Sequence, residues 1–348
     1  MRKLIVAMQT LITKVLEGLF GTVRTAFWLG LWLFGLGVLS TYLLRWWPGD
    51  RLVPVRLLNY MIPWLLIPLV LALIVAGLAR RHWLFAVLAI PTILIGLSQA
   101  PLFLPRLSPA LGDGGSFKVM SYNVGRRNRD VTAMTTLIRH EQPDILLLQE
   151  LRPDRVEAFI ETLGDLYPDA ELHFTYDPYT LQAVASRYPL TRLAIMPEKA
   201  QALKVLLETP NGPVTVINVH TYFPDWQALY EELSALLAED IIPTDGPLIL
   251  GGDFNTTDQT QIYRMFSQHL RNAHWEAGWG FGFTYPSYRG RIRGIFRVPQ
   301  VVRIDHIFYS DHFHADNAGT LTESGRSDHL PVVAEFSWIK CGPLDSRE

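Results

Sequence analysis

Polar side chains that could bind a metal ion or transfer protons stand at the ends of several apolar segments of this sequence. Met120–Asn123 ends in an amide, Ile145–Glu150 in a carboxylate and Val216–His220 in an imidazole. An isolated buried charge is unfavourable unless it is paired or bound to a metal, so such endings are informative where the segments are buried strands. Together they would supply oxygen ligands for a divalent cation and an imidazole for proton transfer.

A second group of polar residues follows the apolar segment Leu248–Leu250. Gly251 and Gly252 come first, then Asp253 and, two residues later, Asn255. Residues two apart in an extended chain face the same way, so both polar side chains would point to one side of the strand. The glycines would permit close approach of a backbone or a ligand.

Asp305–His306 and Asp328–His329 are further carboxylate–imidazole pairs near the C-terminus. Taken singly, a carboxylate after a strand is more often a helix cap or a turn former, and His220 alone would more often be structural. Six such endings in one stretch of chain favour a catalytic site instead.

The ordered series Ser-Tyr-Asn, Gln-Glu, Asn-Val-His, Gly-Asp-Phe-Asn, Asp-His and Ser-Asp-His resembles the endonuclease/exonuclease/phosphatase superfamily, whose fold is also called DNase I-like. The resemblance spans residues 117–338. It implies an α/β fold, namely a four-layered α/β sandwich of two packed sheets flanked by helices. It also implies hydrolysis of a phosphate ester by an activated water, with Mg²⁺ as the divalent cation and Mn²⁺ as its substitute.

The same resemblance implies roles for three metal-site residues. Glu150 matches the principal ligand, Asn123 the amide that supports it, and Asp328 a further ligand or a contact behind the ligands. Mg²⁺ needs hard oxygen ligands and commonly takes only one or two carboxylates while it keeps several waters, which agrees with this set.

Five further residues match the catalytic positions of the family. His329 matches the imidazole at the scissile phosphate, and Asp305 matches the carboxylate that orients it. Asp253 and Asn255 match the pair that positions or deprotonates the attacking water and holds a phosphate oxygen. His220 matches a histidine that donates to a phosphate oxygen as negative charge develops there. The resemblance leaves open whether Asp253 or His329 is the general base.

Two departures from the family pattern disfavour a nuclease. Gln182–Arg187 lacks the glycine that the family more often has near the start of this strand. The tyrosine that nucleic-acid-cleaving members place near the phosphate has no clear match.

The stretch from residue 275 to residue 303 is a candidate substrate rim. Its aromatic residues are followed by arginines with no acidic residue between them. Arginine side chains suit phosphate, and Trp and Tyr suit a bilayer surface or a base. The alternative is a solvated loop with some core aromatics. The candidate substrate-binding residues are Arg187, Trp279, Tyr285, Arg289, Arg291 and Arg293.

The composition divides the chain into two unlike parts. With 348 residues, 49% of them hydrophobic, and a mean hydropathy of +0.15, it is neither disordered nor collagen-like. Residues 1–105 carry nine Lys and Arg against two Asp and Glu, whereas the whole chain has a net charge of −2. A basic, apolar front and an acidic body predict a membrane anchor joined to a soluble domain. The single cysteine, Cys341, excludes an intrachain disulfide.

The front part has the pattern of membrane helices. Residues 4–23 show the spacing of an amphipathic helix, which either packs on neighbouring helices or lies in the membrane interface. Three uncharged apolar stretches follow, Ala26–Leu44, Leu57–Ala79 and Trp83–Pro105, each near the ~20 residues that span a bilayer. We therefore expect three transmembrane helices, with a hydrophobic helical domain in water as the alternative.

The distribution of basic residues predicts an orientation. The N-terminal segment and the second connection together carry six Lys and Arg residues, against four on the opposite side. The positive-inside rule then places the N-terminus in the cytoplasm and, after three crossings, the catalytic domain outside it. We expect an integral protein of the bacterial inner (plasma) membrane with an extracytoplasmic catalytic domain.

Four regions are expected: a membrane region over residues 1–107, a linker over 108–116, a catalytic domain over 117–338 and a tail over 339–348. The expected strands are Phe117–Asn123, Asp144–Gln149, Gln182–Ser186, Val214–His220, Pro247–Gly251, Val302–Tyr309 and Pro331–Phe336. The expected helices of the catalytic domain are Asp130–Glu141, Pro153–Gly164, Asp225–Glu239 and Asp258–Gln268.

These observations predict a membrane-bound, Mg²⁺-dependent phosphodiesterase or phosphatase that acts on a phosphorylated lipid or a lipid-linked phosphate. A membrane-tethered endonuclease or exonuclease and a non-catalytic binding module are the alternatives. The tether favours lipid over nucleic acid, because the local concentration of a lipid substrate is high at the bilayer. A binding module would lack site residues, and none is missing. The sequence predicts neither the head group nor the oligomeric state.

Overall fold

The computed structural model describes residues 2–47, 49–104, 115–167, 169–195, 201–221, 226–287, 291–292, 296–297 and 299–339. The chain separates into two compact units, Met1–Ala100 and Pro101–Glu348. Most of the expected linker and of the expected tail, including Cys341, lies outside the described residues.

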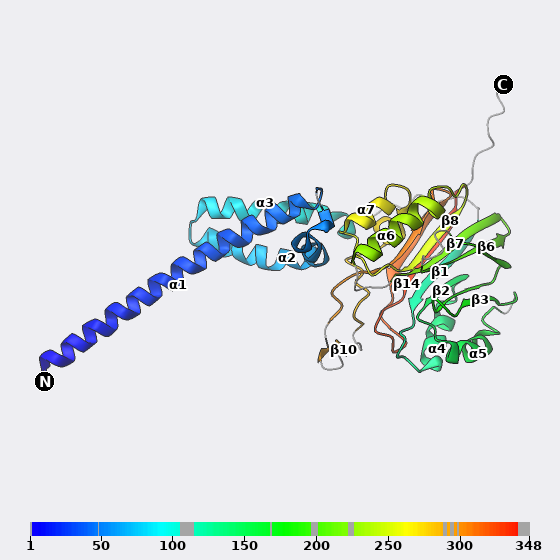
Figure 1. Cartoon of the computed structure of the whole chain (residues 1–348), viewed down its shortest axis with the longest axis horizontal. Coiled ribbons are helices and arrows are strands. Elements are labelled where there is room, and N and C mark those ends of the chain that lie inside the picture. Colours follow the sequence, from blue (N-terminus) through cyan, green and yellow to red (C-terminus); the bar gives the residue numbers. More distant parts are fainter. Residues whose placement is uncertain are drawn as a thin grey trace, which may run out of the picture. The chain divides into compact units, whose positions relative to one another are not determined.

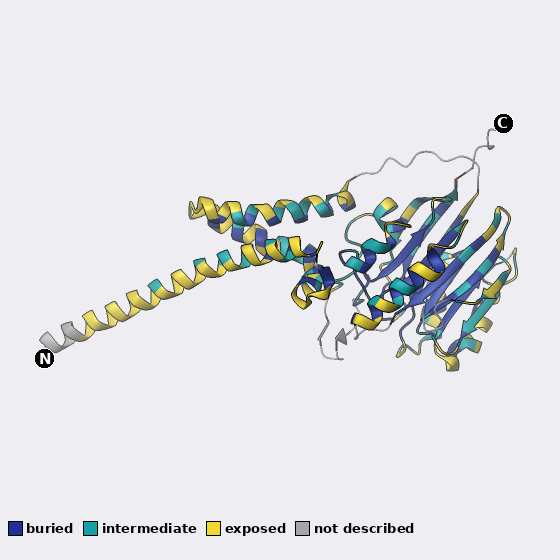
Figure 2. Cartoon of the chain, turned by 45° about the horizontal axis from the view of Figure 1, so that its top comes forward, coloured by how far each residue is buried: buried dark blue, intermediate teal, exposed yellow. Residues whose placement is uncertain are grey.

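Long apolar helices make up the first unit, α1 (Arg2–Leu44), α2 (Val53–Leu78) and α3 (His82–Gln99), as Figure 1 shows. Short 3₁₀ turns follow α1 and α3, at Gly49–Arg51 and Ala100–Phe103. Within the described residues, three segments are long and apolar enough to cross a membrane: Met8–Leu44, Val53–Leu78 and His82–Phe103. Few of their residues are buried (Figure 2), and this much accessible apolar surface is unfavourable in water and suits a lipid environment.

Helix α1 joins two features that the sequence pattern separates. The amphipathic helix expected over residues 4–23 and the span expected over Ala26–Leu44 form one continuous helix, because no proline or turn sequence stands between them. Gly35 allows α1 and α3 to approach closely, since a Cβ atom there would lie 2.9 Å from Cδ2 of Leu88.

Two six-stranded sheets form the centre of the second unit. The strands of the first sheet are β1 (Ser116–Asn123), β2 (Ile145–Gln149), β3 (His173–Asp177), β4 (Gln182–Ser186), β13 (Phe313–Thr320) and β14 (Val332–Trp338). Those of the second sheet are β5 (Leu190–Leu193), β6 (Ala202–Thr209), β7 (Gly212–His220), β8 (Leu248–Asp253), β9 (Arg271–Asn272) and β12 (Asp305–Tyr309). The orders are β13-β14-β1-β2-β4-β3 and β5-β6-β7-β8-β12-β9. A separate ribbon pairs β10 (Arg291–Ile292) with β11 (Phe296–Arg297).

Helices cover the outer faces of the two sheets. The first sheet packs on α4 (Val131–Glu141) and α5 (Pro153–Leu163) through a buried core that includes Met134 and Phe159. The second sheet is covered by α6 (Trp226–Leu236) with the π-helical turn Leu237–Ile241, and by α7 (Gln261–Phe266), as Figure 1 shows. A short helix, α8 (Ala273–Ala277), follows β9. The second unit is therefore the expected four-layered α/β sandwich.

Strand β1 shows how alternation in the sequence builds these layers. Val119 joins the core between the sheets together with Leu147 of β2. Met120 and Tyr122 belong to the other core, beneath α4 and α5. Because successive side chains of a strand point to opposite faces, one apolar strand serves both cores.

Strand pairing brings the polar endings together. Strands β1 and β2 are parallel, and Asn123 lies opposite Gln149. Strands β7 and β8 are also parallel, and His220 lies opposite Asp253. Strand β12 runs antiparallel to β8 and begins with Asp305, opposite Asp253. The polar residues that end or begin these strands therefore gather at one edge of each sheet.

Buried side chains connect the two sheets beneath these endings. Gln149 Nε2, on β2, donates to Oδ1 of Asn218, on β7, at 2.7 Å. Asn218 Nδ2 donates to the carbonyl oxygens of Leu148 at 2.8 Å and Ala183 at 3.0 Å. Buried polar groups need such partners, so this bridge fixes how the polar edges of the two sheets meet.

Candidate active site

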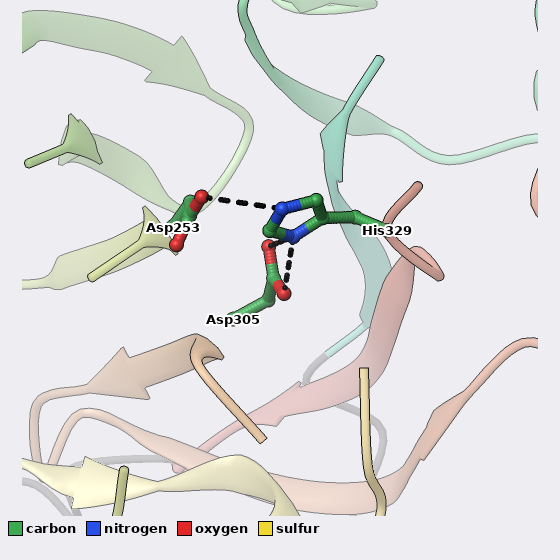
Figure 3. A group of neighbouring side chains, drawn as sticks. All are labelled: Asp253, Asp305 and His329. Atoms are coloured by element: carbon green, nitrogen blue, oxygen red, sulfur yellow. Dashed lines mark hydrogen bonds and ion pairs between the residues drawn. The ribbon is translucent and has the colours of Figure 1, made fainter. Parts of the chain in front are cut away.

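Three buried side chains from separate segments meet where the polar strand ends gather (Figure 3). His329 Nδ1 lies 3.0 Å from Oδ2 and 3.2 Å from Oδ1 of Asp305. His329 Nε2 lies 3.7 Å from Oδ2 of Asp253. Residues that are far apart in the sequence thus form one cluster, and the cluster contains the groups that a proton-transfer site requires.

The charges of this cluster depend strongly on one another. Burial disfavours a charged His329, but the carboxylates of Asp305 and Asp253 outweigh burial and raise the pKa of His329 to about 10. Burial raises the pKa of Asp253 to about 7, although the charge of His329 acts in the opposite direction. The cluster therefore favours a positive group between its carboxylates, either an imidazolium or a metal cation.

Ser327 holds the segment that carries His329. Its Oγ donates to the backbone carbonyl of Asn123 at 2.7 Å, which ties the segment to the end of β1. The same hydroxyl accepts from the backbone N–H of His329 at 3.1 Å. No role for Ser327 follows from the sequence alone, although it is the first residue of the Ser-Asp-His motif.

Amide groups fix the carboxylate of Asp253. Asn123 Nδ2 donates to its Oδ2 at 3.0 Å, and the backbone N–H of Asn255 donates to its Oδ1 at 2.9 Å. Asn255 Nδ2 donates to the carbonyl of Thr221 at 2.8 Å. Asn255 has a φ of 48°, in the left-handed region, which Asn tolerates better than most residues. The structure thus brings Asn123 and Asn255 to the cluster.

Glu150 and His220 lie beside Asp253. His220 Nε2 is 3.5 Å from Oε1 of Glu150 and 3.9 Å from Oδ2 of Asp253. Burial lowers the pKa of His220, although the charge of Glu150 opposes this. Glu150 directly follows β2 and has a φ of 59°, which is strained for a residue other than glycine. The strained backbone is therefore at the end of β2, where the Glu150 carboxylate lies beside His220.

Asp328 and Tyr285 lie at the margin of the cluster. Asp328 is exposed. A Cβ atom on Gly125 would lie 3.1 Å from Oδ1 of Asp328, so the loop after β1 and the segment before His329 are in close contact. The ring centroid of Tyr285 is 4.8 Å from that of His329. Burial, followed by the charges of Asp328 and Asp253, raises the pKa of Tyr285. The phenol therefore lies within the electrostatic reach of the site carboxylates.

Of the other candidate substrate-binding residues, the structure describes Arg187 and Trp279, and it does not bring them to the cluster. Arg187 follows β4, which runs antiparallel to β2, so it lies at the far end of the sheet and pairs with Asp144 at 2.7 Å. Trp279 is 65% exposed and contacts Phe103 edge to face. Arg289 and Arg293 lie outside the described residues, and the side chain of Arg291 is not described.

The donor atoms of the site fit a divalent cation. Asp253, Asp305 and His329 each offer one ligand atom, and these atoms lie within 4.8 Å of one another. Carboxylate oxygens are the ligands that Mg²⁺ and Mn²⁺ prefer. The raised pKa of the buried Asp253 carboxylate also shows that a positive charge beside it would be favourable. The residues present are therefore compatible with a divalent metal site.

Comparisons with known proteins point to one family. The model of the "Endonuclease/Exonuclease/phosphatase family" matches residues 120–329. No curated protein matches this sequence.

Solved structures share the fold at low sequence identity. An endonuclease/exonuclease/phosphatase family protein from Bacteroides thetaiotaomicron is 19% identical, with a TM-score of 0.51, over 65% of this chain and 96% of that chain. A mannosyl-6-phosphatase from Bacteroides thetaiotaomicron VPI-5482 is also 19% identical, with a TM-score of 0.51, over 64% of this chain and 100% of that chain. TDP2 from D. rerio, complexed with a single-strand DNA product, is 16% identical, with a TM-score of 0.50, over 64% of this chain and 99% of that chain.

Proposed function

The chain belongs to the endonuclease/exonuclease/phosphatase family of phosphoester hydrolases, and we propose that it is a membrane-bound, Mg²⁺-dependent hydrolase of a lipid or lipid-linked phosphate. The observation that carries this proposal is that one chain contains both the cluster of Asp253, Asp305 and His329 and three helices that could cross a membrane. A site tethered to a bilayer meets lipid substrates at high local concentration.

In the proposed reaction a water oxygen attacks phosphorus, the P–O bond to the leaving oxygen breaks, and the leaving oxygen takes up a proton. Each ring nitrogen of His329 faces a carboxylate, which favours the imidazolium, so we assign His329 to binding the phosphoryl oxygens. Asp305 orients that ring, and Asp253 accepts the proton of the attacking water. The neutral His220 donates to a phosphoryl oxygen. With His329 protonated and Asp253 and Asp305 in these roles, Glu150 would hold a divalent cation, which would supply Lewis-acid stabilisation of the developing charge.

The proposal is tested with the full-length protein in nanodiscs and Mg²⁺. Three substrates are compared: a phosphodiester lipid, a short polyprenyl diphosphate and short single-stranded DNA. We expect turnover of at least one lipid substrate, no DNA cleavage above background, and loss of turnover in the His329→Ala variant, because losing the phosphate-side imidazole removes several kcal/mol of transition-state stabilisation. Faster cleavage of DNA than of either lipid would instead identify a nuclease, and binding without turnover would identify a binding module.

We also propose that the second unit lies on the extracytoplasmic side, as the distribution of basic residues predicts. Tyr179 is 94% exposed and lies in the turn between β3 and β4. A Tyr179→Cys variant in a Cys341→Ser background carries one accessible thiol. A membrane-impermeant thiol reagent should label it in intact spheroplasts. Labelling only after lysis would place the second unit in the cytoplasm.

A further inference from the structure

The loop between β1 and α4 carries three arginines beside the site. This arginine loop, residues 125–130, contains Arg126, Arg127 and Arg129, all exposed. Across the residues that the structure describes, none of the three guanidinium groups forms an ion pair with a carboxylate. Three like charges so close together repel one another, so an anionic ligand would be favourable at this loop.

Buried hydrogen bonds fix the backbone of the arginine loop. Arg155, which is 5% exposed, donates to the carbonyl of Gly125 at 3.3 Å and to that of Arg126 at 2.7 Å. Asn128 Nδ2 donates to the carbonyl of Gly325 at 2.9 Å, and the N–H of Asn128 donates to the carbonyl of Gly125 at 2.9 Å. A loop anchored in this way presents its side chains in a preorganised arrangement, which reduces the entropy lost on binding.

The arginine loop also borders the catalytic cluster. The backbone N–H of Arg126 donates to Oε2 of Glu150, and that of Gly125 donates to Oδ1 of Asn123 at 3.0 Å. An anion bound by the loop would therefore lie next to a phosphate bound at the cluster.

Other charged residues around the loop already have partners. Asp130 accepts from the N–H of Ala133 at the start of α4 and pairs with Arg326 at 2.9 Å. Arg152, on the loop after Glu150, pairs with Asp154 at 3.0 Å. The arginines at 126, 127 and 129 differ from these neighbours in that no carboxylate neutralises them in the described part of the chain.

We propose that the arginine loop binds a second phosphate of the substrate, adjoining the phosphate that is hydrolysed. The substrate class is then a diphosphate ester or another ester with two neighbouring phosphates. Guanidinium groups bind phosphate through paired, charge-assisted hydrogen bonds, each of which contributes about tenfold or more in affinity. The identity of the substrate rests on the hydrolase function proposed above, whereas the anion site does not.

Binding is tested first, because it does not require turnover. Inorganic pyrophosphate and inorganic phosphate are titrated calorimetrically into the full-length protein in zwitterionic nanodiscs. The wild type should bind pyrophosphate more tightly than phosphate, and the Arg127→Gln/Arg129→Gln variant should lose about tenfold or more of its pyrophosphate affinity. Arg271→Gln is the control, since this exposed residue pairs with Asp311 and lies beside Tyr309, at the opposite end of β12 from Asp305. Equal pyrophosphate affinity in the wild type and the double variant would overturn the proposal.

Turnover then tests the substrate class. The ratio of kcat/KM for a polyprenyl diphosphate to that for the matching monophosphate should fall about tenfold or more in the double variant and stay at the wild-type value in Arg271→Gln. An unchanged ratio in the double variant would contradict the assignment. An effect of the double variant that appears only in anionic nanodiscs would assign the arginines to the lipid surface and would also contradict it. If neither substrate is hydrolysed but pyrophosphate affinity depends on the arginines, the hydrolase proposal fails and the anion site stands.

Discussion

Asp305 faces the Nδ1 atom of His329 with both carboxylate oxygens, at 3.0 and 3.2 Å, while the Nε2 atom of the same ring faces Asp253 at 3.7 Å. Asp305→Asn keeps the shape of the side chain but removes the charge that orients the ring and stabilises its protonated form. We expect turnover to fall about 10²–10⁴-fold.

The Asp305→Asn variant should also lower the pKa of His329, which NMR titration of the imidazole measures. Asp311→Asn is the matched control, because Asp311 is exposed and forms an ion pair with Arg271. Near-normal turnover in Asp305→Asn would show that the pairing does not orient His329 for catalysis.

The elements that carry the site were largely predictable, because their sequences are apolar and end in polar residues. Gln182–Ser186 has the expected bounds, and β1, β2 and β7 differ from expectation by one or two residues. Strand β6 was not predicted, since Ala202–Thr209 mixes apolar and polar residues without strict alternation. Strand β13 was missed because its sequence, with Asp316, Asn317 and Gly319, is typical of a loop; it is an edge strand with a bulge, where such residues are tolerated.

The order of motifs indicated which residues belong to the site but not how they are held. His220 meets Asp253 because β7 and β8 pair in one register, which depends on the whole sheet. Ser327 bonds to the backbone of Asn123, at the end of β1, and Arg155 bonds to the backbone of Gly125. Both hydrogen bonds join residues far apart in the chain, so no local sequence pattern predicts them. For the same reason the arginine loop could be placed beside Glu150 only from the structure.

Removal of the Glu150 carboxylate should impair both metal binding and turnover. Glu150→Gln keeps the size of the side chain but loses the charged oxygen ligand, so we expect turnover to fall at least ~10²-fold. Titration with Mn²⁺ followed by electron paramagnetic resonance should show at least about tenfold weaker binding. Treatment of the wild type with EDTA should abolish turnover, and Mg²⁺ should restore it.

Glu157→Gln provides the control for that variant, because Glu157 is exposed on α5 and the charge change is the same. Wild-type Mn²⁺ affinity in Glu150→Gln would exclude Glu150 as a ligand.

The bridge between the sheets should contribute to stability. Asn218→Leu leaves the Nε2 atom of Gln149 and the carbonyls of Leu148 and Ala183 without the hydrogen bonds that Asn218 provides. Each lost partner of a buried polar group destabilises by about 1–3 kcal/mol, so a total of roughly 3 kcal/mol or more is expected. Thermal unfolding in detergent measures it. Asn317→Leu, at an exposed position of β13, should change stability by less than ~0.5 kcal/mol; equal effects of both variants would contradict a role for the bridge.

Stability should also depend on pH through His274. Burial, followed by the charge of Arg303, lowers the pKa of His274 from 6.5 to about 3. The unfolded chain therefore binds a proton between these values that the folded chain does not bind. The stabilising effect is fully present above about pH 6.5 and is lost as the pH falls towards 3.

His274→Gln keeps a donor for the carbonyl of Gly280, which lies 2.9 Å from Nε2 of His274, but cannot titrate. The free energy of unfolding of this variant should fall less steeply between pH 6 and pH 4, by at most about 1.4 kcal/mol per pH unit. Chemical denaturation at a series of pH values measures the slope. Identical slopes for variant and wild type would mean that His274 is protonated in the folded protein.

Gly252 allows β8 to pass closely alongside β7 directly before Asp253. Its φ is +145°, and a Cβ atom at this position would lie 1.9 Å from the carbonyl oxygen of Val219. The backbones of Gly252 and Val219 are paired in the sheet, so neither can move without breaking the register that places His220 opposite Asp253. Gly252→Ala should therefore destabilise the second unit by at least ~3 kcal/mol or prevent its folding.

Gly319→Ala is the matched control, because a Cβ atom there meets no atom within 4 Å. Thermal unfolding of both variants tests the prediction, and a Gly252→Ala protein with the stability of Gly319→Ala would show that the β7–β8 contact is looser than the structure indicates.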